Sequence, residues 1–181
     1  MGPVNYFLGF EVKRNNSSLL LTQTKYAHDL LEKAKMEYSK PCVTPMALGT
    51  KLGKEIRDLF DQPTLYQSIV GGLQYLTLSK PDIAFTVNKL SQFLQNPTVL
   101  HWTACKRVLW YIKGTLKYGL VFKPHKFLHL EAYVDADWAS DINDHRSTCG
   151  YAMFLGDNLV QWSSKSKKWC PYPLLKLNTR H

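Results

Sequence analysis

Three prolines divide the middle of the chain into three segments with helical periodicity. Pro63, Pro81 and Pro97 each stand where a helix could begin, and proline is favoured in the first turn of a helix. After each proline, apolar residues recur at steps of three and four, which places them on one helix face: Leu65, Ile69, Leu73 and Leu76; Ile83, Val87, Leu90 and Leu94; Trp102, Cys105, Leu109 and Ile112. The pattern predicts three consecutive helices, the last of them ending near Gly114.

A shorter helix is predicted before these three. Its apolar residues follow Thr24, a suitable N-cap residue, at helical spacing: Ala27, Leu30, Leu31 and Ala34. Residues 39–60 contain two prolines and two glycines, which predicts a connecting loop.

Both ends of the chain show the patterns of β-strands. Residues 6–12 and 19–24 are rich in aromatic and branched side chains and flank a turn at residues 15–18, which predicts a β-hairpin. From Leu120 the apolar period changes to two, and strands are predicted near residues 128–134, 149–155 and 159–163. The predicted fold class is therefore α+β: a β-hairpin, a helical middle and an antiparallel meander of three strands.

The cysteines and the apolar runs indicate an intracellular protein in an unspecified compartment. The four cysteines are far apart and form no Cys-x-x-Cys pair, and no charged segment followed by an apolar one stands at the start. No apolar run approaches the roughly 18 residues that a membrane span requires. We expect no membrane partner, and the oligomeric state stays open.

The positive charge is concentrated in two segments. The net charge is +9, and residues 83–130 hold seven Lys/Arg and no acid, while residues 158–181 hold five and no acid. Neutralisation of phosphates supplies most non-specific affinity for nucleic acid, so these segments are candidates for a phosphate-binding surface. A solvated basic surface that keeps the chain soluble by repulsion explains the charge equally well.

One side of the last predicted helix carries Lys106, Trp110 and Lys113. An aromatic ring between two cations suits a backbone phosphate with a base or sugar beside it. In the alternative interpretation, Trp110 packs beneath the lysine side chains and binds nothing.

A strand that ends in aspartate is the one candidate for metal chemistry. Asp135 and Asp137 come at the end of the strand predicted near residues 128–134, and alternate residues of a strand face the same side. No Asp or Glu follows Asp157, and two carboxylates alone bind magnesium weakly, because this ion prefers octahedral oxygen coordination and releases its water reluctantly. The alternative for Asp137 is that it caps the turn. The histidines have no carboxylate or cysteine partner at a recognisable spacing.

Several motifs in a fixed order resemble the Pol polyprotein of copia-type LTR retrotransposons. They are YFLGFEV at residues 6–12, LTQTKY at 21–26, YQSIVGGLQYL at 66–76, KPDI at 80–83 and the region around Asp135. The resemblance runs from about residue 4 to about residue 165. It implies three parts: the end of a reverse transcriptase palm at 1–24, a thumb- or connection-like region at 25–118, and a truncated ribonuclease H-like domain at 119–181.

The resemblance also implies the roles of individual residues. The hairpin is similar to a primer grip, so Leu8, Gly9 and Phe10 are expected to contact nucleic acid. Asp135 matches the first catalytic aspartate of the ribonuclease H domain, which in the intact family helps to hold two magnesium ions. Here we expect Asp135 to be vestigial and its metal site to be weak or empty, with no cofactor.

The chain departs from the family at two places. The Tyr-x-Asp-Asp polymerase motif lies upstream of the hairpin in the family, and this chain starts after it. Beyond Lys165 the family continues with a helix that begins Ser-Thr-x-Glu-Ala-Glu-Tyr, whereas this sequence continues SKKWCPYP from residue 166. We therefore expect a divergent tail from about residue 166.

Three hypotheses about function follow. The first is an inactive part of a reverse transcriptase and ribonuclease H polyprotein that binds RNA, DNA or their hybrid without specificity. The second is an active metal-dependent ribonuclease for RNA–DNA hybrids, with the missing carboxylates supplied by another chain. The third is a fragment that has no binding role.

Overall fold

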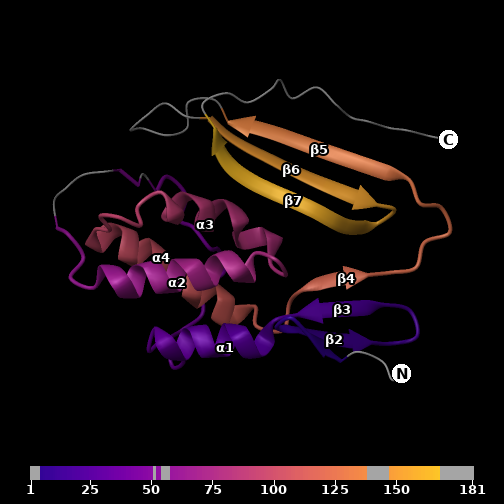
Figure 1. Cartoon of the computed structure of the whole chain (residues 1–181), viewed down its shortest axis with the longest axis horizontal. Helices are drawn as coiled ribbons and strands as arrows, with labels where there is room; N and C mark the ends of the chain where they lie inside the picture. The colour runs from indigo at the N-terminus through magenta and orange to yellow at the C-terminus, as the bar shows by residue number, and fades with distance from the viewer. Residues whose placement is uncertain (1–4, 51, 54–57, 138–146, 168–181) are drawn as a thin grey trace. The chain divides into compact units, whose positions relative to one another are not determined.

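The computed structural model describes residues 5–50, 52–53, 58–137 and 147–167. Within them the chain is α+β, as predicted, with four α-helices between strands at either end (Figure 1). It divides into a helical unit, Gln23–Tyr118, and a strand unit formed by Met1–Thr22 and Gly119–His181. No helix in the described part of the chain combines the length and the apolar character that crossing a membrane requires.

The helical unit contains the predicted helices. They are α1 (Thr24–Lys33), α2 (Pro63–Leu76), the short 3-10 helix η1 (Pro81–Ile83), α3 (Ala84–Ser91) and α4 (Val99–Gly114). The predicted apolar stripes form its core: Ile69, Leu73, Leu76, Ile83, Leu90, Cys105, Leu109 and Ile112 are all fully buried. The stripes therefore identified the buried faces correctly, although α3 ends before Leu94.

The N-cap predicted for α1 is wrong. Gln23, not Thr24, occupies the cap position, and its side chain makes no capping hydrogen bond. The Thr24 hydroxyl instead donates to the carbonyl oxygen of Leu116, 3.4 Å away. A tertiary contact within the unit has displaced the local capping interaction.

α1 ends in a Schellman motif with a lysine in the left-handed position. Lys35 has a φ of 54°. Its amide donates to the Glu32 carbonyl at 2.8 Å, and the Met36 amide donates to the Leu31 carbonyl at 2.9 Å. Met36 is buried in the same core as Leu31, which completes the motif with its usual apolar contact.

The predicted loop between α1 and α2 is confirmed for its described residues. Backbone hydrogen bonds join it to α4 near the start of the loop and to the residue before the α4 cap at its end. The Cys42 amide donates to the Trp110 carbonyl, and the Phe60 amide donates to the Pro97 carbonyl. Directly after Pro97, Thr98 caps α4 in a capping box with His101.

The strand unit contains two antiparallel sheets. The first has the order β1-β2-β3-β4, formed by β1 (Tyr6–Phe7), β2 (Phe10–Arg14), β3 (Leu19–Thr22) and β4 (Leu120–Phe122). The hairpin of β2 and β3 is as predicted. The strand expected over residues 6–12 is interrupted, because Leu8 and Gly9 both have positive φ, 46° and 74°, and form a two-residue turn.

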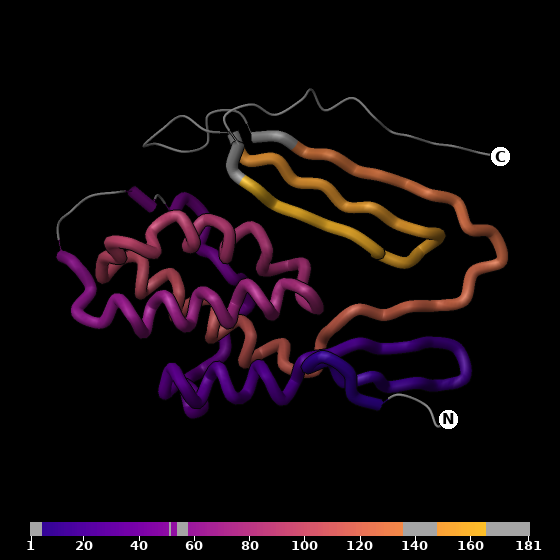
Figure 2. Tube along the Cα trace, viewed as in Figure 1, coloured from indigo at the N-terminus to yellow at the C-terminus, as the bar shows by residue number. Residues whose placement is uncertain are grey.

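The period-two pattern from Leu120 marks a strand, but this strand joins the N-terminal hairpin. β4 pairs with β3, with Leu20 opposite Val121. The predicted division of the chain at residues 24 and 118 did not anticipate this pairing. Through it, the backbone N–H and C=O groups at the free edge of β3 gain hydrogen-bond partners in β4. Figure 2 traces the chain from β3 through the helices and back into β4.

The second sheet is the predicted meander. It has the order β5-β6-β7, formed by β5 (Leu130–Asp137), β6 (Ser147–Leu155) and β7 (Asn158–Lys167), all antiparallel. Gly156 and Asp157 connect β6 to β7, and Gly156 has a φ of 58°. Most of the expected divergent tail lies outside the described residues.

Candidate nucleic-acid interface and the Asp135 position

Asp135 lies on an exposed position of β5. Its cross-strand partner on β6 is Gly150, and Gly150 is in turn opposite Ser164 of β7. Neither neighbour carries a carboxylate. Asp137 is the last residue of β5, two positions further along, and its side chain lies outside the described part of the chain.

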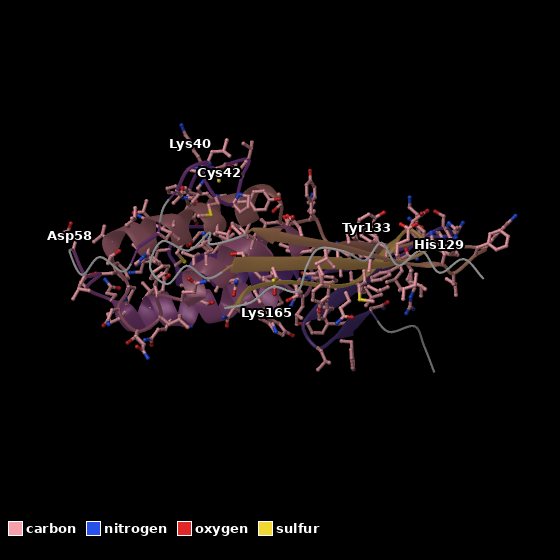
Figure 3. The ribbon with its side chains drawn as sticks, turned by 90° about the horizontal axis from the view of Figure 1, so that it is seen from above. Lys40, Cys42, Asp58, His129, Tyr133 and Lys165 are labelled. Carbon is pink, nitrogen blue, oxygen red and sulfur yellow. The ribbon has the colours of Figure 1, made fainter. Side chains whose placement is uncertain are left out.

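Glu131 is a further carboxylate of β5, and it is engaged near the other end of the strand. Glu131 accepts a hydrogen bond from the Tyr133 hydroxyl at 2.9 Å and lies 3.3 Å from the imidazole of His129. Tyr133 and His129 are labelled in Figure 3. The hydrogen bond that the Tyr133 hydroxyl donates to the Glu131 carboxylate raises the pKa of Tyr133. Four residues of extended strand separate Glu131 from Asp135 by roughly 13 Å, too far for both to bind one ion.

The residues described here do not fit the two-magnesium site of the intact family. Such a site needs carboxylates that bridge ions about 4 Å apart. The cross-strand position beside Asp135 is a glycine, with a serine one strand further, and the described residues contain no group of three or more His, Cys, Asp or Glu arranged to hold a metal ion.

The three residues expected to resemble a primer grip lie together at the turn between β1 and β2. Leu8 and Gly9 form the turn, and Phe10 begins β2 half-buried. Leu8 is 69% exposed, and the neighbouring Tyr6 and Phe7 are also exposed. The turn therefore presents apolar side chains to solvent.

The row of Lys106, Trp110 and Lys113 lies along α4. Trp110 is half-buried and packs against the helical core. The Lys113 ammonium group donates to the carbonyl oxygen of Glu37. Of the two cations, Lys113 thus has an internal contact, whereas the structure gives the Lys106 ammonium none among the described residues.

The sequence analysis missed the structural role of the KPDI motif. Lys80 is buried, and its ammonium donates to the carbonyl oxygens of Thr115 and Tyr118 just beyond α4. Burial lowers the pKa of Lys80, and nearby Asp82 opposes this effect. Cations are favourable at a helix C-terminus, so Lys80 fastens this end of α4 to the start of η1.

Asp82 makes a second contact to α4. The Tyr111 hydroxyl donates to a carboxylate oxygen of Asp82 at 2.5 Å, and burial together with this hydrogen bond raises the pKa of Tyr111 to about 12. In the sequence, the only sign of the contacts of Lys80 and Asp82 was that these residues flank Pro81 at the start of a predicted helix.

Comparison with curated proteins identifies relatives along nearly the whole chain. The chain is 46% identical over 165 residues to the retrovirus-related Pol polyprotein from transposon RE2 of Arabidopsis thaliana, an alignment with 91% of this chain and 11% of that protein. It is 36% identical over 179 residues to the corresponding polyprotein from transposon TNT 1-94 of Nicotiana tabacum, with 93% of this chain and 13% of the relative aligned.

A shorter relative matches over most of its own length. The uncharacterized mitochondrial protein AtMg00810 of Arabidopsis thaliana is 43% identical over 166 residues, which are 91% of this chain and 68% of that protein. No family model matches the chain, and no solved structure does. The chain spans about a tenth of the polyproteins it matches, and by these similarities it belongs to the family of retrovirus-related Pol polyproteins of copia-type retrotransposons.

Proposed function

We propose that this chain binds RNA, DNA or their hybrid without sequence specificity and does not cut them. The observation that carries the proposal is Lys106 beside Trp110 on α4, within a stretch of 48 residues, 83–130, that contains no acid. A cation in such a stretch attracts phosphate without competition from a carboxylate nearby in the sequence. The second contact surface in this proposal is the exposed turn of Leu8, Gly9 and Phe10.

Lys106 is the stronger of the two phosphate ligands in this proposal. Both lysines are half-buried, but the structure gives the Lys106 ammonium no partner among the described residues, whereas the ammonium group of Lys113 donates to the Glu37 carbonyl and must leave it before it can bind a phosphate at close range. Trp110 packs against the helical core and exposes only part of its ring.

The second part of the proposal is that Asp135 is vestigial. Hydrolysis by two metal ions requires several shared carboxylates. Asp135 has Gly150 across the strand pair and Ser164 beyond it, and residues 158–181 contain no carboxylate side chain. By itself, this chain is therefore expected to leave a hybrid intact.

Salt-dependent binding tests the first part. Fluorescence anisotropy with a labelled duplex should show weak binding that falls steeply with salt, and Lys106→Ala should reduce the slope of log affinity against log salt by about 0.9. Lys113→Ala should reduce it less. Lys89→Ala is the control for position within the same acid-free stretch. The Lys89 ammonium lies 5.5 Å from the Phe85 ring of its own helix, α3, so the slope should stay unchanged if the site is the Lys106–Trp110 face of α4. Wild-type chain with no measurable affinity at low salt contradicts the proposal.

Incubation with a labelled RNA–DNA hybrid in magnesium or manganese tests the second part. Neither the wild-type chain nor Asp135→Asn should release products. Cleavage by the wild type that disappears in Asp135→Asn would instead support a ribonuclease that is completed by a second copy of the chain.

A further inference from the structure

We propose that Tyr38, with Lys35 and Lys40 on either side, is a stacking platform for an unpaired base of single-stranded nucleic acid. The inference rests on the proposed nucleic-acid binding and assigns part of it to a segment outside α4 and outside the β1–β2 turn.

Tyr38 stands at the tip of a tight turn. The Ser39 amide donates to the Met36 carbonyl at 3.1 Å, and the Ser39 hydroxyl donates to the same oxygen at 2.7 Å. This hydrogen bond closes a four-residue turn with Glu37 and Tyr38 at its centre. The Tyr38 side chain is 95% exposed, so its ring is available to a ligand.

The backbone on both sides of Tyr38 is fixed to the helical core. Met36 is buried, and the adjacent Glu37 carbonyl accepts from the Lys113 ammonium. Further along, the Cys42 amide donates to the Trp110 carbonyl at 3.3 Å. A rigid aromatic residue binds at a low cost in conformational entropy, because its backbone does not have to be ordered by the ligand.

Two exposed cations flank the turn. Lys35 precedes it and Lys40 follows it, and the labelled Lys40 points away from the helical unit in Figure 3. A phosphate on each side of a stacked base can be reached by cations placed this way. Glu37 also lies in the turn, but it is half-buried and its carbonyl is held by Lys113.

The position of Lys35 beside the turn is set by the Schellman motif that ends α1, in which Lys35 takes the left-handed φ of 54°.

A single strand is the ligand that this geometry favours. One exposed ring can stack only on a base whose face is free, and bases in a duplex are already stacked on each other. Stacking on aromatic residues tolerates any base, so the platform adds affinity without sequence preference.

The test uses the whole chain and a fluorescein-labelled single strand of mixed sequence. Tyr38→Ala should weaken binding about fivefold or more, whereas Tyr38→Phe should bind like the wild type because the ring remains. Lys40→Ala should lower the salt slope by about 0.7, the value for one phosphate contact on a single strand. Tyr118→Ala is the matched control: Tyr118 is 68% exposed in the same unit and should be replaceable without effect.

The outcomes separate this inference from the proposed function. If Tyr38→Ala leaves the salt-dependent binding unchanged, the platform is overturned and the proposed function stands. The same conclusion follows if Tyr38→Ala weakens binding to a duplex as much as binding to a single strand. If the wild type binds no nucleic acid, both fail. A strand that contains 5-bromouracil should give a photo-crosslink to the peptide with Tyr38, and crosslinks confined to other peptides overturn the platform.

Discussion

At the scale of single residues, His101 occupies the capping-box position that a glutamate or glutamine usually holds. Its Nδ1 accepts a hydrogen bond from the Thr98 amide at 3.0 Å, and its ring stacks on Phe93 with 3.8 Å between centroids. The side chain is fully buried. Burial lowers the pKa of His101, and the backbone of Gly53 acts in the opposite direction. The imidazole is therefore a neutral structural group.

This neutral histidine predicts a loss of stability in mild acid. The unfolded chain takes up a proton on His101 near pH 6.5, whereas the folded chain does so only at lower pH. The free energy of unfolding should therefore fall as the pH drops below about 6.5, by at most about 1.4 kcal/mol per pH unit. His101→Gln keeps an acceptor for the Thr98 amide and removes the titration. Urea unfolding at pH 7.5 and pH 5 should show a smaller decrease for His101→Gln, and equal decreases would contradict a buried neutral imidazole.

At the scale of elements, the end of α1 predicts a stabilising substitution. Lys35→Gly relieves the left-handed strain of roughly 1 kcal/mol, although the greater freedom of glycine in the unfolded chain offsets part of this gain. We expect a net stabilisation of about 0.5 kcal/mol, measured by urea unfolding. Lys33→Gly, two residues earlier in the last turn of α1, should instead destabilise by about 1 kcal/mol. Similar losses in both variants would show that Lys35 is not strained.

The elements also show what the sequence alone could predict. The helical stripes identified buried residues such as Ile69 and Leu109, because burial follows the helical period that the sequence displays. The sequence could not predict that β4 pairs with β3, because strands so far apart carry no common local signal. The contacts of Lys80 were missed for the same reason: a lysine is expected on the surface unless its distant partners are known. The placement of Lys106, Trp110 and Lys113 on one helix needed only local spacing and was predicted correctly.

At the scale of the whole molecule, the two units differ in how much they bury. The described core residues cluster in the helical unit, whereas Leu130, Tyr133, Val134 and Tyr151 of the second sheet are all more than a third exposed. Amides that open only by unfolding a buried core exchange most slowly. We expect hydrogen exchange in α2 and α4 to be slower than in β5–β7 by about tenfold or more, as measured by mass spectrometry of peptides. Equal protection in the two units would show that the chain unfolds as one cooperative body.

The pairing of β4 with β3 also makes the helical unit an insertion between two neighbouring strands. Leu21 is paired with Leu120, so the chain leaves the first sheet after Thr22 and re-enters it at Gly119 about one strand spacing away, roughly 5 Å. At this point a methyl group on Gly119 would meet the Leu21 carbonyl oxygen at 2.0 Å, so the junction admits only glycine. Because the two ends of the helical unit are so close together, the unit can be replaced by a short connection. A tight β-turn in place of residues 23–118 would join β3 and β4 without changing their register.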